Sequence, residues 1–333
     1  MTRPETTIIY TCPYVPAEWI AAHGLHPCRV IPETADPAFL TARTEGVCPY
    51  VRSFICEVMK YKQAGGVVVT TVCDQMRRVF DILVRNCDLP AFLMNVPNTW
   101  QSIAAQKLYI EELKRLSRFL IRLGGMSPST DVLINKMLEY DKARKSILAA
   151  REYLSARQYA EAIAVLGRDG PGGLLNDAAR SGPLTAGVPL AIVGGPLMKR
   201  DLEILGMVEE FGGRIVLDAT ETGERGMCAP FNRRRLSDDP LMELASAYFG
   251  GIQDASRRPD SELYKWLKRQ LVTRAARGIV FHRYVWCDMW HAELGRLKEW
   301  TDLPVLDIDT AGDNETDRNR TENRILAFLE TLQ

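Results

Sequence analysis

Hydrophobic and polar positions along this chain of 333 residues follow two different periods. Short apolar runs rich in Val and Ile, typical of buried strands, alternate with longer stretches in which apolar residues recur at helical spacing. Eight strands are predicted: Thr7–Tyr10, Cys28–Ile31, Gly66–Thr71, Phe92–Val96, Leu190–Val193, Arg214–Leu217, Gly278–Arg283 and Pro304–Ile308. This alternation predicts an α/β fold with largely parallel sheets.

Helical patterns fill the space between the strands. Four are well marked, at Pro16–His23, Arg52–Lys62, Lys107–Leu123 and Val132–Leu148. Because residues 100 to 183 are helical almost throughout, we expect an N-terminal α/β lobe (1–99), a helical linker region (100–185) and a C-terminal α/β lobe (186–333). The alternative is one large domain with a helical insertion.

Composition narrows the function classes. The 42 Lys and Arg residues balance 42 Asp and Glu residues, so no basic field for nucleic acid and no polybasic membrane patch is expected. The first residues resemble no targeting segment, and no apolar run approaches the length of a membrane span. The sequence therefore predicts a cytoplasmic protein.

The eight cysteines are informative in a reducing cytoplasm, which disfavours disulfides. None forms a C-x-x-C pair, so zinc ribbons and compact ferredoxin ligand runs are unsupported. Any metal site must therefore gather ligands from distant parts of the chain. The four histidines show no recognisable ligand spacing.

Three cysteines occupy the same kind of place. Cys73 in GGVVVTTVCDQMRRVF and Cys287 in GIVFHRYVWCDMWHAEL each follow a strand and are each followed by Asp and a helix. Cys48, in GVCPYVRSFICEVMK, precedes Pro49, which is favoured in the first turn of a helix. Ligands bind beyond the carboxyl ends of parallel strands, and helix N-termini stabilise thiolates. A shared metal site and three inert buried cysteines both remain open on these grounds.

The same residues carry a family resemblance. TCPYVPAEWIAAHGLHPCRV, CPYVRS, TTVCDQMRR and RYVWCDMWHAEL resemble, in order, the opening and the three ligand motifs of the 2-hydroxyacyl-CoA dehydratase / benzoyl-CoA reductase family, in its iron–sulfur (D-component type) subunits. The resemblance implies two Rossmann-like or flavodoxin-like lobes with a [4Fe-4S] cluster between them. Its ligands would be Cys48, Cys73 and Cys287, leaving one iron open.

The resemblance also implies partners and a reaction. It implies a dimer with a paralogous subunit or a second copy of this chain. It also implies a separate ATP-dependent iron–sulfur activator that delivers electrons. A separate activator agrees with this sequence, which contains no G-x-x-x-x-G-K-[ST] phosphate-binding loop of its own. Such anaerobic enzymes dehydrate (R)-2-hydroxyacyl-CoA or reduce aromatic acyl-CoA thioesters. One added electron would give a ketyl radical that expels hydroxide, which makes the unreactive C3 proton acidic.

Further cysteines exceed this ligand set. Related double-cubane reductases of small molecules act as homodimers and hold a larger [8Fe-9S] cluster with additional cysteines. Here the additional ligands could be Cys12, Cys56 and Cys228. The alternative is that these cysteines are packed in the core and bind no metal. A third interpretation is a non-catalytic electron-transfer or scaffold subunit whose partner binds substrate. The acyl group is not determined by the sequence.

Three residues are candidates for proton chemistry. Glu18, in the Y-x-P-x-E motif, is either a base or the anchor of a helix N-terminus. His291 lies at i+4 from Cys287, which predicts a place near the cluster or in packing. Glu221 belongs to the loop DATETGERGMCAPFNRRR, which follows a strand and is either part of the cleft or a solvated surface loop.

Overall fold

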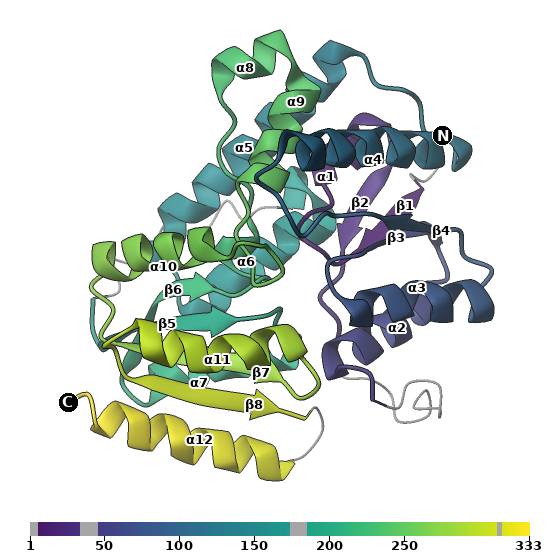
Figure 1. Ribbon diagram of the computed structural model, residues 1–333. Helices are drawn as coiled ribbons and strands as arrows, with labels where there is room; N and C mark the ends of the chain where they lie inside the picture. Colours follow the sequence, from purple (N-terminus) through teal and green to yellow (C-terminus); the bar gives the residue numbers. More distant parts are fainter. Residues whose placement is uncertain (1–5, 34–45, 174–184, 312–314) are drawn as a thin grey trace.

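The computed structural model describes residues 6–33, 46–173, 185–311 and 315–333 (Figure 1). The N-terminal sheet contains β1 (Thr7–Tyr10), β2 (His26–Arg29), β3 (Ala64–Thr70) and β4 (Ala91–Met94). These strands are parallel and stand in the order β2-β1-β3-β4.

The C-terminal sheet repeats this arrangement. It contains β5 (Val188–Gly194), β6 (Gly213–Ala219), β7 (Gly278–Tyr284) and β8 (Val305–Thr310), all parallel, in the order β6-β5-β7-β8. All eight predicted strands are thus confirmed, as is the α/β fold class with two parallel sheets. In each sheet the strand order reverses next to the first strand, between β1 and β3 and between β5 and β7.

Helices cover both faces of each sheet (Figure 1). Hydrophobic residues alternate along the strands: Ile9, Val67 and Val69 pack against one layer of helices, whereas Ile8 and Val68 pack against the other. The N-terminal sheet is covered on one face by α2 (Pro49–Lys60) and α3 (Asp74–Asn86), and on the other by α1 (Ala17–Ala22) and α4 (Ile103–Arg122).

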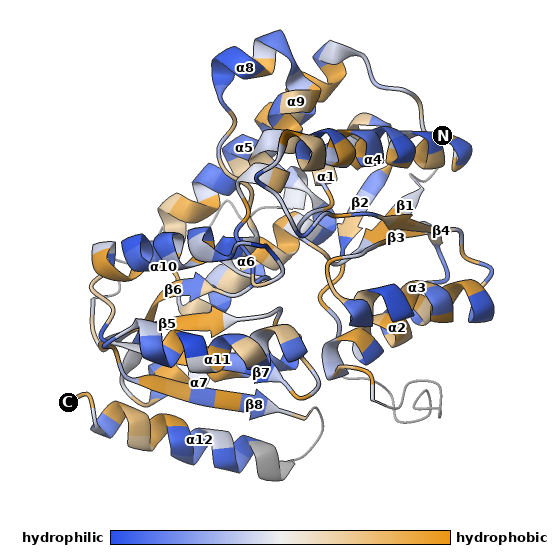
Figure 2. Ribbon diagram, in the orientation of Figure 1, coloured by the Kyte–Doolittle hydropathy of each residue, from blue (hydrophilic) through white to orange (hydrophobic). Residues whose placement is uncertain are grey.

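The C-terminal sheet is built on the same plan. One face packs against α7 (Glu203–Glu210) and α12 (Glu315–Glu330), and the other against α10 (Ser261–Thr273) and α11 (Asp288–Trp300). Figure 2 shows apolar strands between helices whose outer faces are polar. This is the burial expected of a parallel sheet covered on both sides.

The segment predicted to be helical contains α4, α5 (Thr130–Ala150), the 3-10 turn η3 (Arg151–Tyr153), α6 (Ala156–Asp169) and η4 (Pro171–Gly173). Helix α6 contacts β2 of the N-terminal sheet as well as α7 and β6 of the C-terminal half, so it joins the two lobes. The exact domain boundaries remain a prediction. All four well-marked helical patterns are confirmed, within a few residues, as α1, α2, α4 and α5.

A second helical group lies in the C-terminal half of the sequence but packs on the N-terminal lobe. It consists of α8 (Arg233–Asp238), α9 (Pro240–Ala245) and the π-helical turn η7 (Ser246–Gly250), and it contacts α4 and α5. The remaining 3-10 turns are η5 (Arg200–Leu202) and η6 (Glu224–Gly226). The lobes are therefore held together by helices contributed in both directions.

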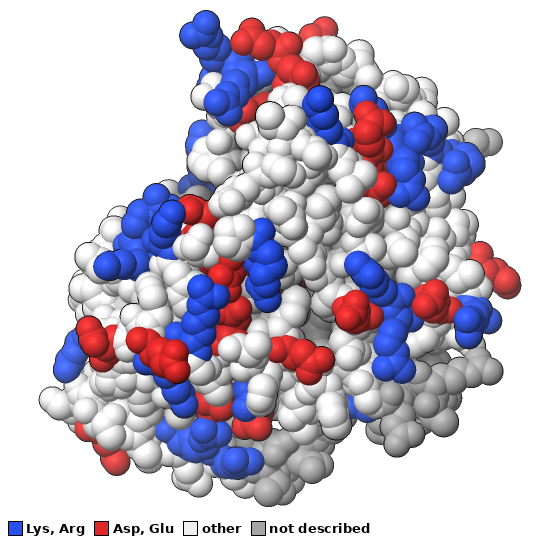
Figure 3. All heavy atoms as spheres, in the orientation of Figure 1, with Lys and Arg blue, Asp and Glu red and all other residues white. Residues whose placement is uncertain are grey.

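The surface agrees with the balanced composition. On the face shown in Figure 3, acidic and basic side chains are interspersed and no single-sign field covers it. Within the described part of the chain, no helix has the length and apolar character needed to cross a membrane.

Candidate functional site

Cys48, Cys73 and Cys287 each stand at the N-cap of a helix. Cys48 precedes α2, with Pro49 in its first turn; Cys73 precedes α3; and Cys287 precedes α11. The sulfur of Cys73 accepts a hydrogen bond from the Met76 main-chain N–H at 3.4 Å. The three thiols are therefore aimed from the positive ends of three helix dipoles.

The three cysteines line a single cavity between the two sheets, with a volume of about 280 Å³. Fold topology explains the meeting of Cys73 and Cys287, because they follow β3 and β7, the strands at the two points where strand order reverses. The N–H of Cys48 donates to the side chain of Gln75 in α3 at 3.2 Å, which ties the first turn of α3 to the start of α2. The lining residues include Thr11, Cys12, Pro13, Tyr14, Tyr50, Thr71, Arg77, Pro196, Glu221, Asp254, Tyr284, Asp288 and Trp290.

The thiols act on one another electrostatically. Burial is the main cause that raises the pKa of Cys48 to about 11 and the pKa values of Cys73 and Cys287 to about 12. Cys73 further raises the pKa of Cys48, Cys287 that of Cys73, and Cys48 that of Cys287. Three buried thiols that repel one another as thiolates form a site that a cationic group would stabilise.

A fourth cysteine belongs to the cavity. Cys12 follows β1 at the first switch point, is buried, and has a pKa raised by burial and by Glu221. Cys56 and Cys228 do not line the cavity, although both are buried. Of these three open candidates, the structure thus brings only Cys12, which was predicted at a strand end, to the cavity.

Among the described residues, no group of three His, Cys, Asp or Glu side chains is placed to hold a single metal ion. A cluster makes a different demand, since each thiolate binds a different iron and the sulfurs stand farther apart than around one ion. Three free cysteines that line one cavity and influence one another's pKa fit that donor set.

Acidic groups line the same cavity. Glu221 follows β6, and its main-chain carbonyl accepts a hydrogen bond from Arg29 of the N-terminal lobe at 3.0 Å. Burial, reinforced by Asp254, raises the pKa of Glu221 to about 7, while Arg29 and Arg225 act against this rise. The cavity thus contains a carboxyl group that is partly protonated near neutral pH.

Asp254 was not singled out by sequence reasoning. It lies in the segment between η7 and α10, and it is held by the fully buried Arg225, which donates to its carboxylate. Arg225 also donates to the carbonyls of Gly194 and Ala219 and lies 4.8 Å from the centre of the Trp290 ring. No sequence signal identifies Asp254, because its position depends on a partner in another loop.

Two predicted candidates lie outside the cavity. Glu18 is fully buried, and its carboxylate accepts hydrogen bonds from Arg144 at 2.6 Å and from Tyr248 at 2.5 Å. His291 is exposed on α11. Of the three predicted proton-transfer residues, the structure brings only Glu221 to the cysteines.

The rest of the loop after β6 is structural or exposed. Glu224 accepts hydrogen bonds from Arg274 at 2.8 and 2.6 Å, on the side of the loop away from the cysteines. Arg233 is exposed and pairs with Asp141 at 2.8 Å. Trp290 is buried in the cavity wall, whereas Trp286 is 62% exposed and takes a left-handed backbone conformation (φ 66°) immediately before Cys287.

These features define a class: a two-lobed α/β protein whose paired switch points enclose a cavity lined by cysteines. A family model described as 2-hydroxyglutaryl-CoA dehydratase, D-component, matches residues 12–332. Since the match spans nearly the whole chain, the chain belongs to this family and is a dehydratase-type component. The family predicted from the four motifs is thereby confirmed. No curated protein matches the chain.

Proposed function

We propose that this chain is the iron–sulfur subunit of a radical (R)-2-hydroxyacyl-CoA dehydratase or of a related acyl-CoA reductase of the benzoyl-CoA type. One observation carries the proposal: three cysteines, each the N-cap of a different helix, line one cavity at the switch points of two matching sheets. Family membership supports the dehydratase assignment.

Cys48, Cys73 and Cys287 would hold a [4Fe-4S] cluster. When bound, such a cluster supplies an open iron as a Lewis acid and a route for single electrons. The chain prepares the site by burying the three thiols together, so that their deprotonation is favoured only when a positive group joins them.

Glu221 is the proton donor that the geometry favours. Its side chain lines the same cavity as the three cysteines, and its raised pKa keeps a proton on the carboxyl in part of the molecules at neutral pH. That proton can pass to a departing hydroxyl oxygen and release it as water. Arg225 and Asp254 fix the polar wall beside Glu221, and the buried Trp290 ring excludes water next to it.

The cavity accommodates only the reacting part of a substrate. Pockets for whole small molecules measure about 300–1,000 Å³, and this cavity, at about 280 Å³, lies just below that range. The remainder of a coenzyme A thioester would lie outside it.

The partners follow from the family. Its description is that of one component of a dehydratase, which supports assembly with another component. We propose that this other component is a paralogous subunit or a second copy of the chain, and that a separate ATP-dependent activator reduces the assembly. The alternative of a non-catalytic scaffold subunit would place acyl-CoA turnover in the partner alone.

Turnover by the assembled, anaerobic enzyme tests the proposal. Dehydration of a 2-hydroxyacyl-CoA and reduction of an aromatic acyl-CoA would be measured for wild type, Cys287→Ala and Cys87→Ala. Cys87, at the C-cap of α3 and outside the cavity, is the matched control. We expect loss of one of these activities in Cys287→Ala and full activity in Cys87→Ala. Equal activity in all three would assign the chemistry to the partner.

Cys12 supports a second candidate, a double-cubane reductase of small molecules. It is a buried fourth cysteine in the same cavity, which a three-cysteine cluster does not require. The double-cubane function predicts about eight irons per chain and loss of about half of them in Cys12→Ala. About four irons, unchanged in Cys12→Ala, would exclude it.

A further inference from the structure

Hydroxyl groups line the cysteine cavity beside the thiols. Among the described residues, the tyrosines and threonines in its wall are Thr11, Tyr14, Tyr50, Thr71 and Tyr284. Tyr14 donates its hydroxyl hydrogen to the main-chain carbonyl of Ile252 at 3.2 Å. Tyr284 donates to the carboxylate of Asp201. The hydroxyl hydrogens of Tyr14 and Tyr284 are therefore committed to acceptors of the protein.

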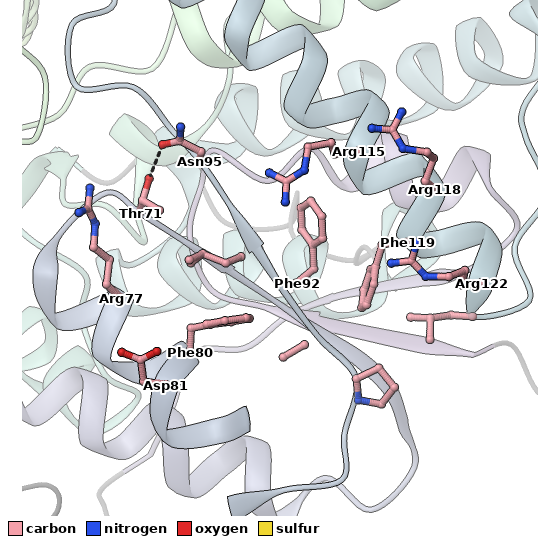
Figure 4. Close-up of a pocket in the computed structure, with 14 residues that line it drawn as sticks. Thr71, Arg77, Phe80, Asp81, Phe92, Asn95, Arg115, Arg118, Phe119 and Arg122 are labelled. Atoms are coloured by element: carbon pink, nitrogen blue, oxygen red, sulfur yellow. Dashed lines mark hydrogen bonds between the residues drawn. The ribbon is translucent and has the colours of Figure 1, made fainter. Parts of the chain in front are cut away.

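Thr71 is committed in the same way. Its hydroxyl donates to the side-chain oxygen of Asn95 at 3.0 Å and accepts from the N–H of Val96 at 2.9 Å. Figure 4 shows the bond between Thr71 and Asn95 in the wall of a broad depression over β4, which shares Thr71 with the cysteine cavity. Thr71 thus has no hydroxyl hydrogen to offer a ligand in either space.

Thr11 and Tyr50 differ, because their hydroxyl groups bond to each other. The two oxygens lie 2.5 Å apart, and either can be the donor. Both residues are only 3% exposed, and within the part of the chain that the structure describes neither hydroxyl has a further partner. Two hydroxyls carry two hydrogens, and one hydrogen bond uses one of them. Whichever residue donates, one buried O–H of the pair is left without an acceptor among the described groups.

The pair is held next to Glu221. Thr11 follows β1 directly, and Tyr50 lies in the first turn of α2, two residues after Cys48. The side chain of Arg29 donates to the main-chain carbonyl of Thr11 at 2.8 Å and to that of Glu221 at 3.0 Å. One guanidinium group therefore joins the pair, in the N-terminal lobe, to the loop of the C-terminal lobe that carries Glu221.

The pair acts as a donor and not as a base. Burial, followed by the charge of Glu221, raises the pKa of Tyr50, so the phenol keeps its hydrogen at neutral pH. A buried donor without an acceptor is costly, because it has lost its hydrogen bonds to water and gained none in return. A ligand that presents an acceptor oxygen in the cavity would remove this cost.

We propose that Thr11 and Tyr50 form a hydrogen-bond donor site for an acceptor oxygen of the substrate held in the cysteine cavity. The identity of this oxygen rests on the proposed function, under which it is the carbonyl oxygen of the acyl thioester. That oxygen gains negative charge when the thioester accepts an electron, and the hydrogen bond from the pair then becomes stronger. No O–H bond of the pair breaks, since Glu221 supplies the proton for the departing hydroxyl.

The double variant Tyr50→Phe/Thr11→Val tests this site, because it removes both hydroxyls and nearly keeps the shapes of the two side chains. In the assembled, anaerobic enzyme we expect kcat with the acyl-CoA substrate to fall about 100-fold, with unchanged KM and iron content, because the pair acts most strongly on the charged oxygen. The thermal midpoint of unfolding should stay the same or rise, since the O–H without an acceptor is removed as well.

Tyr264→Phe is the matched control. It removes a buried hydroxyl that donates to Glu293 at 2.5 Å, outside the cavity. We expect it to lower the thermal midpoint and to leave kcat unchanged, the opposite of the result expected for the double variant.

Two results would overturn the proposal and leave the proposed function standing. A lowered thermal midpoint with normal kcat in the double variant would make the pair structural. A raised KM with normal kcat would show that the pair does not favour the charged oxygen. Absence of acyl-CoA turnover in wild type would refute the proposed function instead, whereas a thermal midpoint raised in the double variant would still support the O–H without an acceptor.

Discussion

Cys73 and Cys287 hold equivalent positions in the two halves of the molecule: each caps the helix that follows the third strand of its sheet in chain order, β3 or β7. Both lie at the carboxyl end of a strand at which strand order reverses, where parallel sheets form their binding crevice. Because the two crevices face each other, residues more than 200 positions apart line one cavity.

We expect Glu221 to act in proton transfer and Glu224 to act only in stabilising the fold. Glu221→Gln keeps the shape of the cavity wall but removes the proton, so we expect kcat to fall about 100-fold or more with unchanged iron content. Glu224→Gln breaks the buried contact with Arg274 and should lower thermal stability while kcat per folded molecule stays unchanged. Normal kcat in Glu221→Gln would exclude it as the donor.

Glu18 is expected to stabilise the fold. Glu18→Gln leaves the buried Arg144 without its carboxylate, which should cost about 3–5 kcal/mol of the free energy of unfolding. Glu111→Gln, which breaks an exposed pair with Lys114, should cost at most about 1 kcal/mol. Urea denaturation of both variants measures the difference. A stable Glu18→Gln variant that loses turnover would restore Glu18 as a catalytic candidate.

Asp218 gives a pH dependence of stability. Burial raises its pKa from 3.8 to about 6, so the folded state holds a proton that the unfolded state has released between these values. Its contribution to stability is therefore lost as pH rises through this window. Asp218→Asn keeps acceptance from the Thr220 hydroxyl but cannot ionise. The free energy of unfolding of Asp218→Asn, relative to that of wild type, should therefore rise by about 1 kcal/mol or more between about pH 5 and about pH 8. A difference independent of pH would contradict this.

Most of the fold could be predicted from the sequence, because parallel strands buried on both faces are continuous apolar runs and the helices between them are amphipathic. Cys73 and Cys287 could be predicted for the same reason, since each stands where such a run gives way to a helix, whereas Cys48 is marked by Pro49 in the first turn of α2. The packing of α8, α9 and η7 on the N-terminal lobe could not, because nothing local to residues 233–250 specifies their partners α4 and α5.

The places of His291, Glu18 and Asp254 have physical causes that the sequence does not show. His291 was expected to share a face with Cys287 through i, i+4 spacing, but Cys287 is an N-cap with φ −93° and ψ 82°, outside the helical range to which that spacing applies. Glu18 is paired with Arg144, 126 residues away in sequence, and Asp254 is placed by Arg225. Such long-range pairs of charged side chains leave no periodic signal in one sequence.

Iron and acid-labile sulfide per chain test the central claim most directly, measured on anaerobically purified wild type, Cys73→Ala and Cys87→Ala. Cys73 and Cys87 stand at opposite ends of α3, and only Cys73 lines the cavity. We predict about four irons and four sulfides in wild type and in Cys87→Ala, and loss of the cluster in Cys73→Ala. Absence of iron from wild type after anaerobic reconstitution, or a full complement in Cys73→Ala, would contradict the three-cysteine cluster.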